Sequence, residues 1–119
     1  SAIFVHDTKD VIEKKIKDAY CPEKAVENNP ILDYCKHIIF RKFDEMKIHR
    51  PQKFGGDISL GKYEELEAMY KKGQLHPLDL KNATAAHIEQ MIKPIREHFE
   101  KNKKAKELFD FVKKQEVTR

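Results

Sequence analysis

Tryptophan is absent from this sequence, cysteine occurs twice, and glycine occurs only four times in 119 residues. With so few glycines, the sequence shows no nucleotide-binding βαβ unit and no Gly-rich phosphate loop. No apolar run is near the roughly 18 residues of a membrane span, and there is no signal peptide, so we expect no membrane partner. Cys21 and Cys35 can in principle pair, but two cysteines without CxxC spacing are more typical of reduced thiols, which favours a cytoplasmic protein. The cysteines and histidines show no metal-ligand spacing, so no metal site is predicted.

Charge is what the chain has in abundance. Charged residues make up 37% of the sequence and hydrophobic residues 39%, which at this length is typical of one small domain with a heavily solvated surface. Residues 93–119 hold nine Lys/Arg and five Asp/Glu, a balance of +4, whereas residues 1–92 balance to zero. Such a basic C-terminal segment can face nucleic-acid phosphates. It can equally be a solvated helix surface.

Capping signals and hydrophobic spacing predict a series of short elements. A helix capped by Asp7 or Thr8 is expected to reach about Tyr20, where Pro22 interrupts it, and a short helical turn towards Val26 follows. The next elements are expected in this order: a helix over residues 31–43 with Asn29 as cap and Pro30 in first position, strands over residues 47–50 and 58–60 around a turn, and a helix over residues 62–72 that stops at Gly73.

The last predicted helix begins at Pro77 and carries an apolar stripe with a repeat near 3.6 residues. Pro94 lies inside this pattern and is expected to bend or split the helix. Residues 101–119 are expected as an extra basic helix. The stripe comprises Leu80, Ala83, Ile88, Met91, Ile92, Ile95 and Phe99, and the final helix has Leu108, Phe109 and Val112. The predicted fold class is mainly α: an irregular helical bundle with one small β-hairpin, forming a single domain over residues 1–119.

Two chain reversals carry an unusual set of side chains. In HPLDLKN, Pro77 suits the first helical position, so His76 falls at the cap and Asp79 in the first turn. In KFGGD, Phe54 precedes a Gly-Gly bend at which regular packing does not bury the ring. An aromatic ring, an imidazole and a carboxylate can together stack on an unpaired base and read its edge. The structural alternative is that Asp79 complements the helix dipole by about 0.3–1 kcal/mol, Phe54 belongs to the core and His76 is only a cap or surface residue.

These segments also resemble a known family. KFGGD, YEELEAMY, HPLDLKN and KPIREHF follow one another as in the C-terminal domain of archaeal and eukaryotic tyrosyl-tRNA synthetases, and AYCPEKAVENNPILDY resembles the segment that opens that domain. The resemblance covers about residues 3–99 and leaves residues 101–119 outside. It implies an anticodon-binding domain of a class I aminoacyl-tRNA ligase whose partner is the anticodon loop of tRNA(Tyr).

The resemblance implies that catalysis lies elsewhere in a parent enzyme. The HIGH and KMSKS signatures of class I synthetases are missing, so the catalytic part, with its ATP and magnesium, is expected upstream. This chain is expected to hold no catalytic residue and no cofactor of its own. Family members dimerise through the catalytic domain, so the parent should be a homodimer and this chain a monomer.

The resemblance also assigns roles to individual residues. Asp79 is implied to read the first anticodon base, a guanine, whose ring N–H and exocyclic amine are adjacent donors that one carboxylate accepts together; such a contact discriminates by roughly 1–3 kcal/mol. Phe54 is implied to stack on that guanine, although eukaryotic members tend to place tryptophan there, and His76 to pack against the anticodon bases. Leu78 occupies a variable position and lends apolar contact. The second anticodon-proximal turn is Tyr20, Cys21 and Pro22, unless Tyr20 packs inward and the turn is only a helix break.

Two other interpretations stay open. The opening Ser1-Ala2-Ile3-Phe4 resembles the sibling tryptophanyl-tRNA synthetases as well, although HPLDLKN favours tyrosine. In the second interpretation the chain is a helical protein-interaction module whose long helix from Pro77 docks a partner protein.

Overall fold

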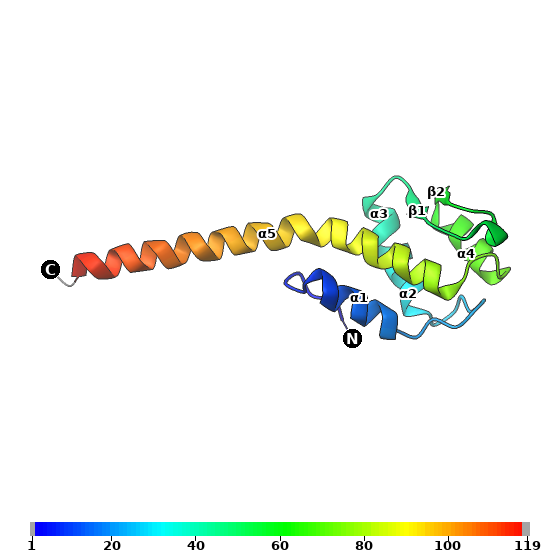
Figure 1. Cartoon of the computed structure of the whole chain (residues 1–119), viewed down its shortest axis with the longest axis horizontal. Coiled ribbons are helices and arrows are strands. Elements are labelled where there is room, and N and C mark those ends of the chain that lie inside the picture. The colour runs from blue at the N-terminus through cyan, green and yellow to red at the C-terminus, as the bar shows by residue number, and fades with distance from the viewer. Residues whose placement is uncertain (1, 118–119) are drawn as a thin grey trace.

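Short helices and a small hairpin pack around the first half of one long helix (Figure 1). The computed structural model describes residues 2–117, with the side chains of Phe109 and of residues 112–117 left out of the description. The elements are α1 (Lys9–Asp18), α2 (Pro30–Tyr34), the π-helical η1 (Cys35–Ile39), α3 (Phe40–Lys42), β1 (Met46–Ile48), the 3-10 helix η2 (Gln52–Phe54), β2 (Ile58–Leu60), α4 (Tyr63–Lys71) and α5 (Pro77–Val117). The predicted fold class, mainly helical with one antiparallel hairpin, is confirmed.

The helix starts in the first third of the chain follow their capping residues. Thr8 caps α1 by accepting a hydrogen bond from the Val11 N–H, and the Asn29 side chain accepts two backbone N–H bonds at the start of α2. The short helical turn expected before Val26 does not form. Lys24 and Asn28 instead adopt positive φ angles of 62° and 54°, which a right-handed helix does not contain.

The helix predicted over residues 31–43 forms as α2, η1 and α3 in succession. Its middle turn is π-helical, which inserts extra backbone into the turn. Ile31, Leu32, Cys35 and Ile39 are all buried on one side of it. Ile38, one residue before the last of these, is 38% exposed.

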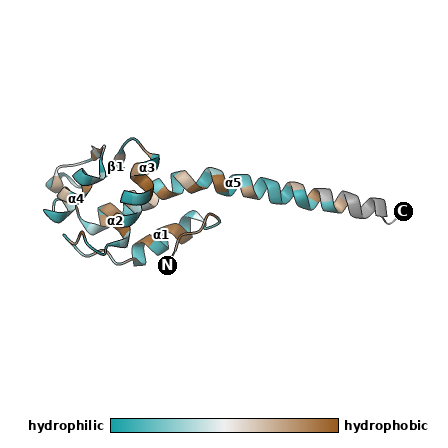
Figure 2. Ribbon diagram, turned by 180° about the vertical axis from the view of Figure 1, so that it is seen from behind, coloured by the Kyte–Doolittle hydropathy of each residue, from teal (hydrophilic) through white to brown (hydrophobic). Residues whose placement is uncertain are grey.

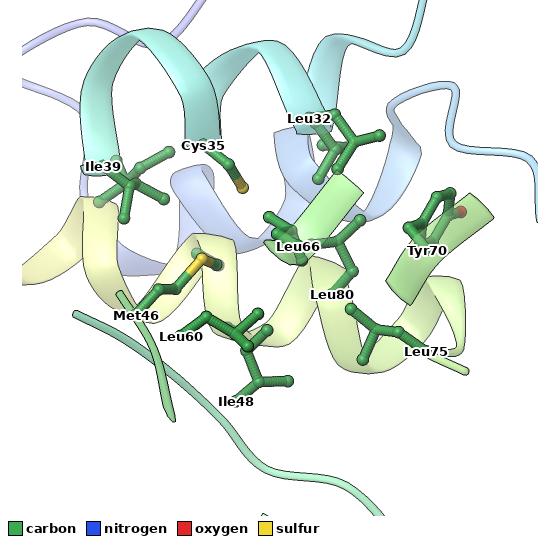
Figure 3. Packing of buried hydrophobic residues seen from close by; sticks show 14 of the residues in the cluster. Leu32, Cys35, Ile39, Met46, Ile48, Leu60, Leu66, Tyr70, Leu75 and Leu80 are labelled. Carbon is green, nitrogen blue, oxygen red and sulfur yellow. The ribbon is translucent and has the colours of Figure 1, made fainter. Parts of the chain in front are cut away.

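The core lies between these helices, the hairpin, α4 and the start of α5 (Figure 3). In the hairpin, Met46 pairs with Leu60 and Ile48 with Ile58, so alternate residues of β1 face inward. The first strand ends at Ile48 rather than at the predicted residue 50. The buried set labelled in Figure 3 is Leu32, Cys35, Ile39, Met46, Ile48, Leu60, Leu66, Tyr70, Leu75 and Leu80.

The long helix α5 departs from the prediction in two ways. It passes through Pro94 without a break, so the expected split is wrong. Pro94 cannot donate a hydrogen bond to the carbonyl of Gln90, but both residues are exposed, and water can take that role. Residues 101–117 continue the same helix and do not form a separate one.

Only the first part of α5 is buried against the rest of the domain. Leu80 and Ile88 are buried, whereas Ile95 is 42% and Phe99 55% exposed, although the sequence pattern placed all four on one inward face. The second half projects away from the body of the domain and is mostly hydrophilic (Figures 1 and 2). Leu108 is also exposed, and the side chains of Phe109 and Val112 lie outside the description. Despite its length α5 is too polar to cross a membrane, and no other helix of the described residues qualifies.

Candidate functional site

Three chain reversals converge at the end of the domain that lies opposite to the projecting part of α5 (Figure 1). They are the turn at residues 20–22, the hairpin loop at residues 51–57, and the connection between α4 and α5 at residues 72–76. These reversals carry most of the residues that the sequence predicts for base recognition. Side chains from neighbouring elements hold each reversal in place.

The turn at residues 20–22 is tied to α4 by the Tyr70 hydroxyl. This hydroxyl donates to the Pro22 carbonyl oxygen at 2.7 Å and lies 3.3 Å from both the carbonyl oxygen and the Sγ of Cys21. Tyr70 is fully buried, and burial raises the pKa of its hydroxyl above the usual range, so the group stays protonated as a donor. Tyr20 itself is 66% exposed, so the inward-packed alternative for Tyr20 is wrong.

The hairpin loop is tied to the α4–α5 connection by Arg50. Its Nε donates to the Gly56 carbonyl oxygen at 2.8 Å, and its Nη1 donates to the Gln74 carbonyl oxygen at 2.9 Å. Gly55 has a φ of 107°, which favours glycine, and a Cβ there would lie 2.7 Å from the Arg50 guanidinium and displace it. Asp57 closes the loop by accepting from the Arg50 N–H at 3.2 Å. Its hydrogen bond with His49, and then the one from Arg50, hold the pKa of Asp57 below the ordinary value.

The two rings predicted to meet a base are accessible. Phe54 is half-buried at the end of η2, with the Lys53 ammonium 5.4 Å from the ring centroid. His76 is exposed, and its Nδ1 accepts a hydrogen bond from the Leu78 N–H at 3.0 Å. The predicted cap role of His76 is therefore confirmed.

Asp79 lies in the first turn of α5, as predicted, and lines a groove of 770 Å³ between β1 and α5. We call this the acidic groove, because Asp44 and Glu45 line it together with Asp79. Three basic side chains also line it, and each has a partner. Lys47 is 3.8 Å from Glu45, and His49 is bound to Asp57. The ring nitrogens of His87 lie 3.3 Å from the Lys47 backbone nitrogen and 2.7 Å from the Ala83 carbonyl oxygen. Asp79 is partly exposed, so its carboxylate is open to a ligand in the groove.

A second groove, of 530 Å³, runs along the other side of α5, against α1. We call it the basic groove. Leu78 lies at its α5 side, and Asn82 and Ala86 line both grooves. The first turns of α5 therefore form a ridge between two grooves of opposite character. The basic groove is lined by Lys9, Glu13, Ile16, Lys17, Leu78, Lys81, Asn82, Ala85, Ala86 and Glu89.

The predicted residues therefore share one end of the molecule without sharing one pocket. Asp79 lines the acidic groove and Leu78 the basic groove, while Phe54 lines neither. Cys21 and Cys35 are free thiols with different neighbours, Tyr70 and Thr84. The sequence analysis missed Arg50 and the hydroxyl role of Tyr70. The only sequence signal for Arg50 was its position directly before Pro51.

Comparisons with known proteins identify the family of this chain. The family model for tRNA synthetases class I (W and Y) matches residues 1–93. The chain belongs to that family. It is 49% identical to the tyrosine–tRNA ligase of Thermococcus sibiricus over 113 aligned residues. This aligned region covers 94% of this chain and 30% of the relative. The tyrosine–tRNA ligase of Saccharolobus solfataricus is 45% identical over all 119 residues and 32% of its own length.

A solved structure shows the same fold within this synthetase family. The tyrosyl-tRNA synthetase of Pyrococcus horikoshii, crystallised with L-tyrosine, superposes with a TM-score of 0.81 at 46% identity, over 91% of this chain and 29% of the other. The resemblance to tyrosyl-tRNA synthetases predicted from the sequence is confirmed. It also extends beyond the predicted limit near residue 99, because the Saccharolobus relative aligns to the end. The chain spans about a third of the length of these relatives.

Proposed function

We propose that this chain is the anticodon-recognition part of a tyrosine–tRNA ligase. The observation that carries the proposal is the convergence of the turn at residues 20–22, the hairpin loop and the start of α5. Tyr70 and Arg50 fix the three segments relative to one another. Side chains held in this way keep their geometry before RNA arrives, which lowers the entropy cost of binding.

The chemistry of the acidic groove supports guanine as the base that Asp79 reads. A groove lined by three carboxylates repels a phosphate backbone and favours a ligand that offers hydrogen-bond donors. Guanine offers two adjacent donors on its Watson–Crick edge, and adenine lacks that arrangement. The half-buried Phe54 and the exposed His76 are the rings on which anticodon bases would stack, at on the order of 1–3 kcal/mol per base. Tyr20, which is exposed at the turn of residues 20–22, is a further ring for stacking.

The test compares short RNA hairpins with guanine or adenine at the first anticodon position. The unmodified chain should bind the guanine hairpin more tightly, and Asp79→Ala should remove most of that preference. A bidentate contact worth about 1–3 kcal/mol corresponds to a preference of about 5- to 150-fold. Equal binding of both hairpins by the unmodified chain would contradict the proposal.

Asp33→Ala is the matched control. Asp33 is an exposed aspartate in the first turn of α2, a helix that also begins with proline. Both substitutions remove a carboxylate that complements a helix dipole, at a cost of about 0.3–1 kcal/mol in folding. Only Asp79→Ala should change the preference for guanine. A thermal melt of each variant confirms that both remain folded.

The parent ligase would supply the chemistry. The activation of tyrosine with ATP and magnesium, and its transfer to tRNA(Tyr), would take place on parts of the enzyme outside these residues. Dimerisation through those parts, with this chain itself monomeric, belongs to the same proposal. The matching family model covers tryptophanyl and tyrosyl enzymes alike, but the relatives described above are tyrosine–tRNA ligases, which favours tyrosine.

A protein-docking role for α5 is the second candidate, because Ile95 and Phe99 are exposed on its projecting half. A salt titration of hairpin binding separates the two. Binding through phosphates weakens steeply as salt is raised, whereas docking of an apolar helix face does not weaken in that way.

A further inference from the structure

The opposite character of the two grooves raises the question of where the RNA backbone lies. If Asp79 reads a base, the sugar and phosphates of that nucleotide must leave the acidic groove, where Asp44 and Glu45 repel them. The neighbouring surface across the α5 ridge is the basic groove. A helix with its side chains is about 10–12 Å across, so the two grooves are within reach of one strand.

The charge of the basic groove suits an anionic ligand. Lys9, Lys17 and Lys81 line it, and none of them forms an ion pair within the described part of the chain. Of its two carboxylates, Glu89 is held by Arg96, at 2.6 Å. Glu13 remains, four residues from both Lys9 and Lys17 on α1. The three lysines therefore outweigh the one carboxylate that has no arginine beside it.

Lys81 is the best-placed of these lysines. Its ammonium donates to the Lys17 carbonyl oxygen at 2.7 Å, one of the carbonyls that the end of α1 leaves without a helical partner. This bond fixes the ammonium at the mouth of the groove and leaves two of its three N–H donors unused. Lys81 follows Asp79 by two residues, and the two side chains line different grooves.

We infer that the basic groove between α1 and α5 binds backbone phosphates of the same RNA strand whose base Asp79 reads. The strand straddles the ridge formed by Asn82 and Ala86. Lys81 and Lys17 contact phosphates on the α1 side, and Leu78 lies beneath the sugar. This inference rests on the proposed function and assigns the phosphate contacts to particular residues.

The experiment measures hairpin affinity against salt for Lys81→Gln, Lys17→Gln and the double variant. The probe is again the pair of hairpins with guanine or adenine at the first anticodon position. Each lost phosphate contact should reduce the slope of log affinity against log salt by about 0.7, and the double variant by about 2 × 0.7, or roughly 1.4. Affinity for both hairpins should fall by the same factor, because phosphate contacts carry no sequence information.

Three controls separate charge, fold and function. Lys14→Gln removes a lysine from α1 that does not line the groove, and it should leave the slope unchanged. Lys81→Arg should restore binding, because a guanidinium keeps the charge and a donor for the Lys17 carbonyl. Lys17→Gln removes a side chain that has no part in that bond, so its result stands even if Lys81→Gln lowers the melting temperature.

The outcomes distinguish this inference from the proposal beneath it. If Lys17→Gln and Lys81→Gln bind like Lys14→Gln while Asp79→Ala loses the preference for guanine, the basic groove is not a phosphate site and the base-reading role stands. If the lysine variants lose more affinity for one hairpin than for the other, the groove reads a base and the inference is again wrong. If the unmodified chain binds neither hairpin, both ideas fall together.

Discussion

Replacing Tyr70 by phenylalanine removes one oxygen atom from the point where α4 holds the turn at residues 20–22. The ring of Tyr70 is fully buried, and its hydroxyl donates to the Pro22 carbonyl oxygen at 2.7 Å. The same hydroxyl lies 3.3 Å from the Cys21 carbonyl oxygen. Phenylalanine fills the same ring volume, so the packing of the core stays and only the hydrogen bonding is lost.

The expected cost follows from what is left unpaired. The Cys21 carbonyl loses its hydroxyl donor, but the Pro22 carbonyl keeps a hydrogen bond from the Ala25 N–H at 3.3 Å. The cost is therefore close to the net value of a hydrogen bond, about 0.5–1.5 kcal/mol. Pro22 is half-buried, so water reaches the site in part and the upper end of that range does not apply. We expect Tyr70→Phe to lower the free energy of unfolding by about 1 kcal/mol.

The assay is urea unfolding of the unmodified chain, Tyr70→Phe and Tyr34→Phe. Tyr34 is half-buried, and its hydroxyl forms no hydrogen bond within the described residues, so Tyr34→Phe should change the free energy of unfolding by less than about 0.5 kcal/mol. If Tyr70→Phe is equally mild, the hydroxyl does not anchor the turn. Of the two side chains that tie the candidate site together, only Arg50 would then remain.

Two further predictions concern the remainder of α5. The hydrogen bond from Arg96 holds the pKa of Glu89 below the ordinary glutamate value of 4.5. Folding therefore favours the charged carboxylate, and its contribution to stability is present above about pH 4.5 and is lost as the pH falls through the lower folded value. Glu89→Gln should be less stable than the unmodified chain near pH 7, and thermal melts should show this difference shrinking below about pH 4.5. A difference that does not depend on pH would refute the prediction. Removing residues 101–119 should change the free energy of unfolding by less than about 0.5 kcal/mol, because Phe99 and Leu108 are exposed. Urea unfolding measures this change, and a loss above about 1 kcal/mol would show that the projecting half supports the fold.

The sequence predicted those features of the fold that depend on neighbouring residues. Asn29 with Pro30 marked the start of α2, and Pro77 with His76 marked the start of α5, because capping is decided within one helical turn. The π-helical turn of η1 was not predictable, since it depends on which side chains the surrounding elements bury. The unbroken course of α5 through Pro94 was missed for a related reason. Whether a proline breaks a helix depends on whether water can reach the carbonyl that it leaves without a donor.

The candidate site was predictable in its residues and not in its arrangement. The motif around Asp79 and His76 carried both the helix start and the family resemblance. Long-range ties had no local signal: Arg50 reaches Gln74, and Tyr70 reaches Pro22, across 24 and 48 positions of sequence. The separation of Asp79 and Leu78 into different grooves follows from helix geometry, because adjacent residues of a helix point about 100° apart. The two side chains line different grooves because α1 flanks α5 on one side and β1 on the other.

The flanking of α5 also bears on how the domain can discriminate without a deep pocket. An open groove selects one base only if the wrong base leaves a charged group without a partner. The carboxylate of Asp79 is left in this way by a base that presents no N–H donors to it. The neighbouring carboxylates of Asp44 and Glu45 repel phosphates from the groove, so the backbone of the strand contributes little affinity there. Affinity must then come from elsewhere on the surface, and the lysines across the ridge are the nearest cationic groups beside α1. Under the proposed function, the acidic groove would set which base is accepted, and the basic groove would set how tightly the strand is held.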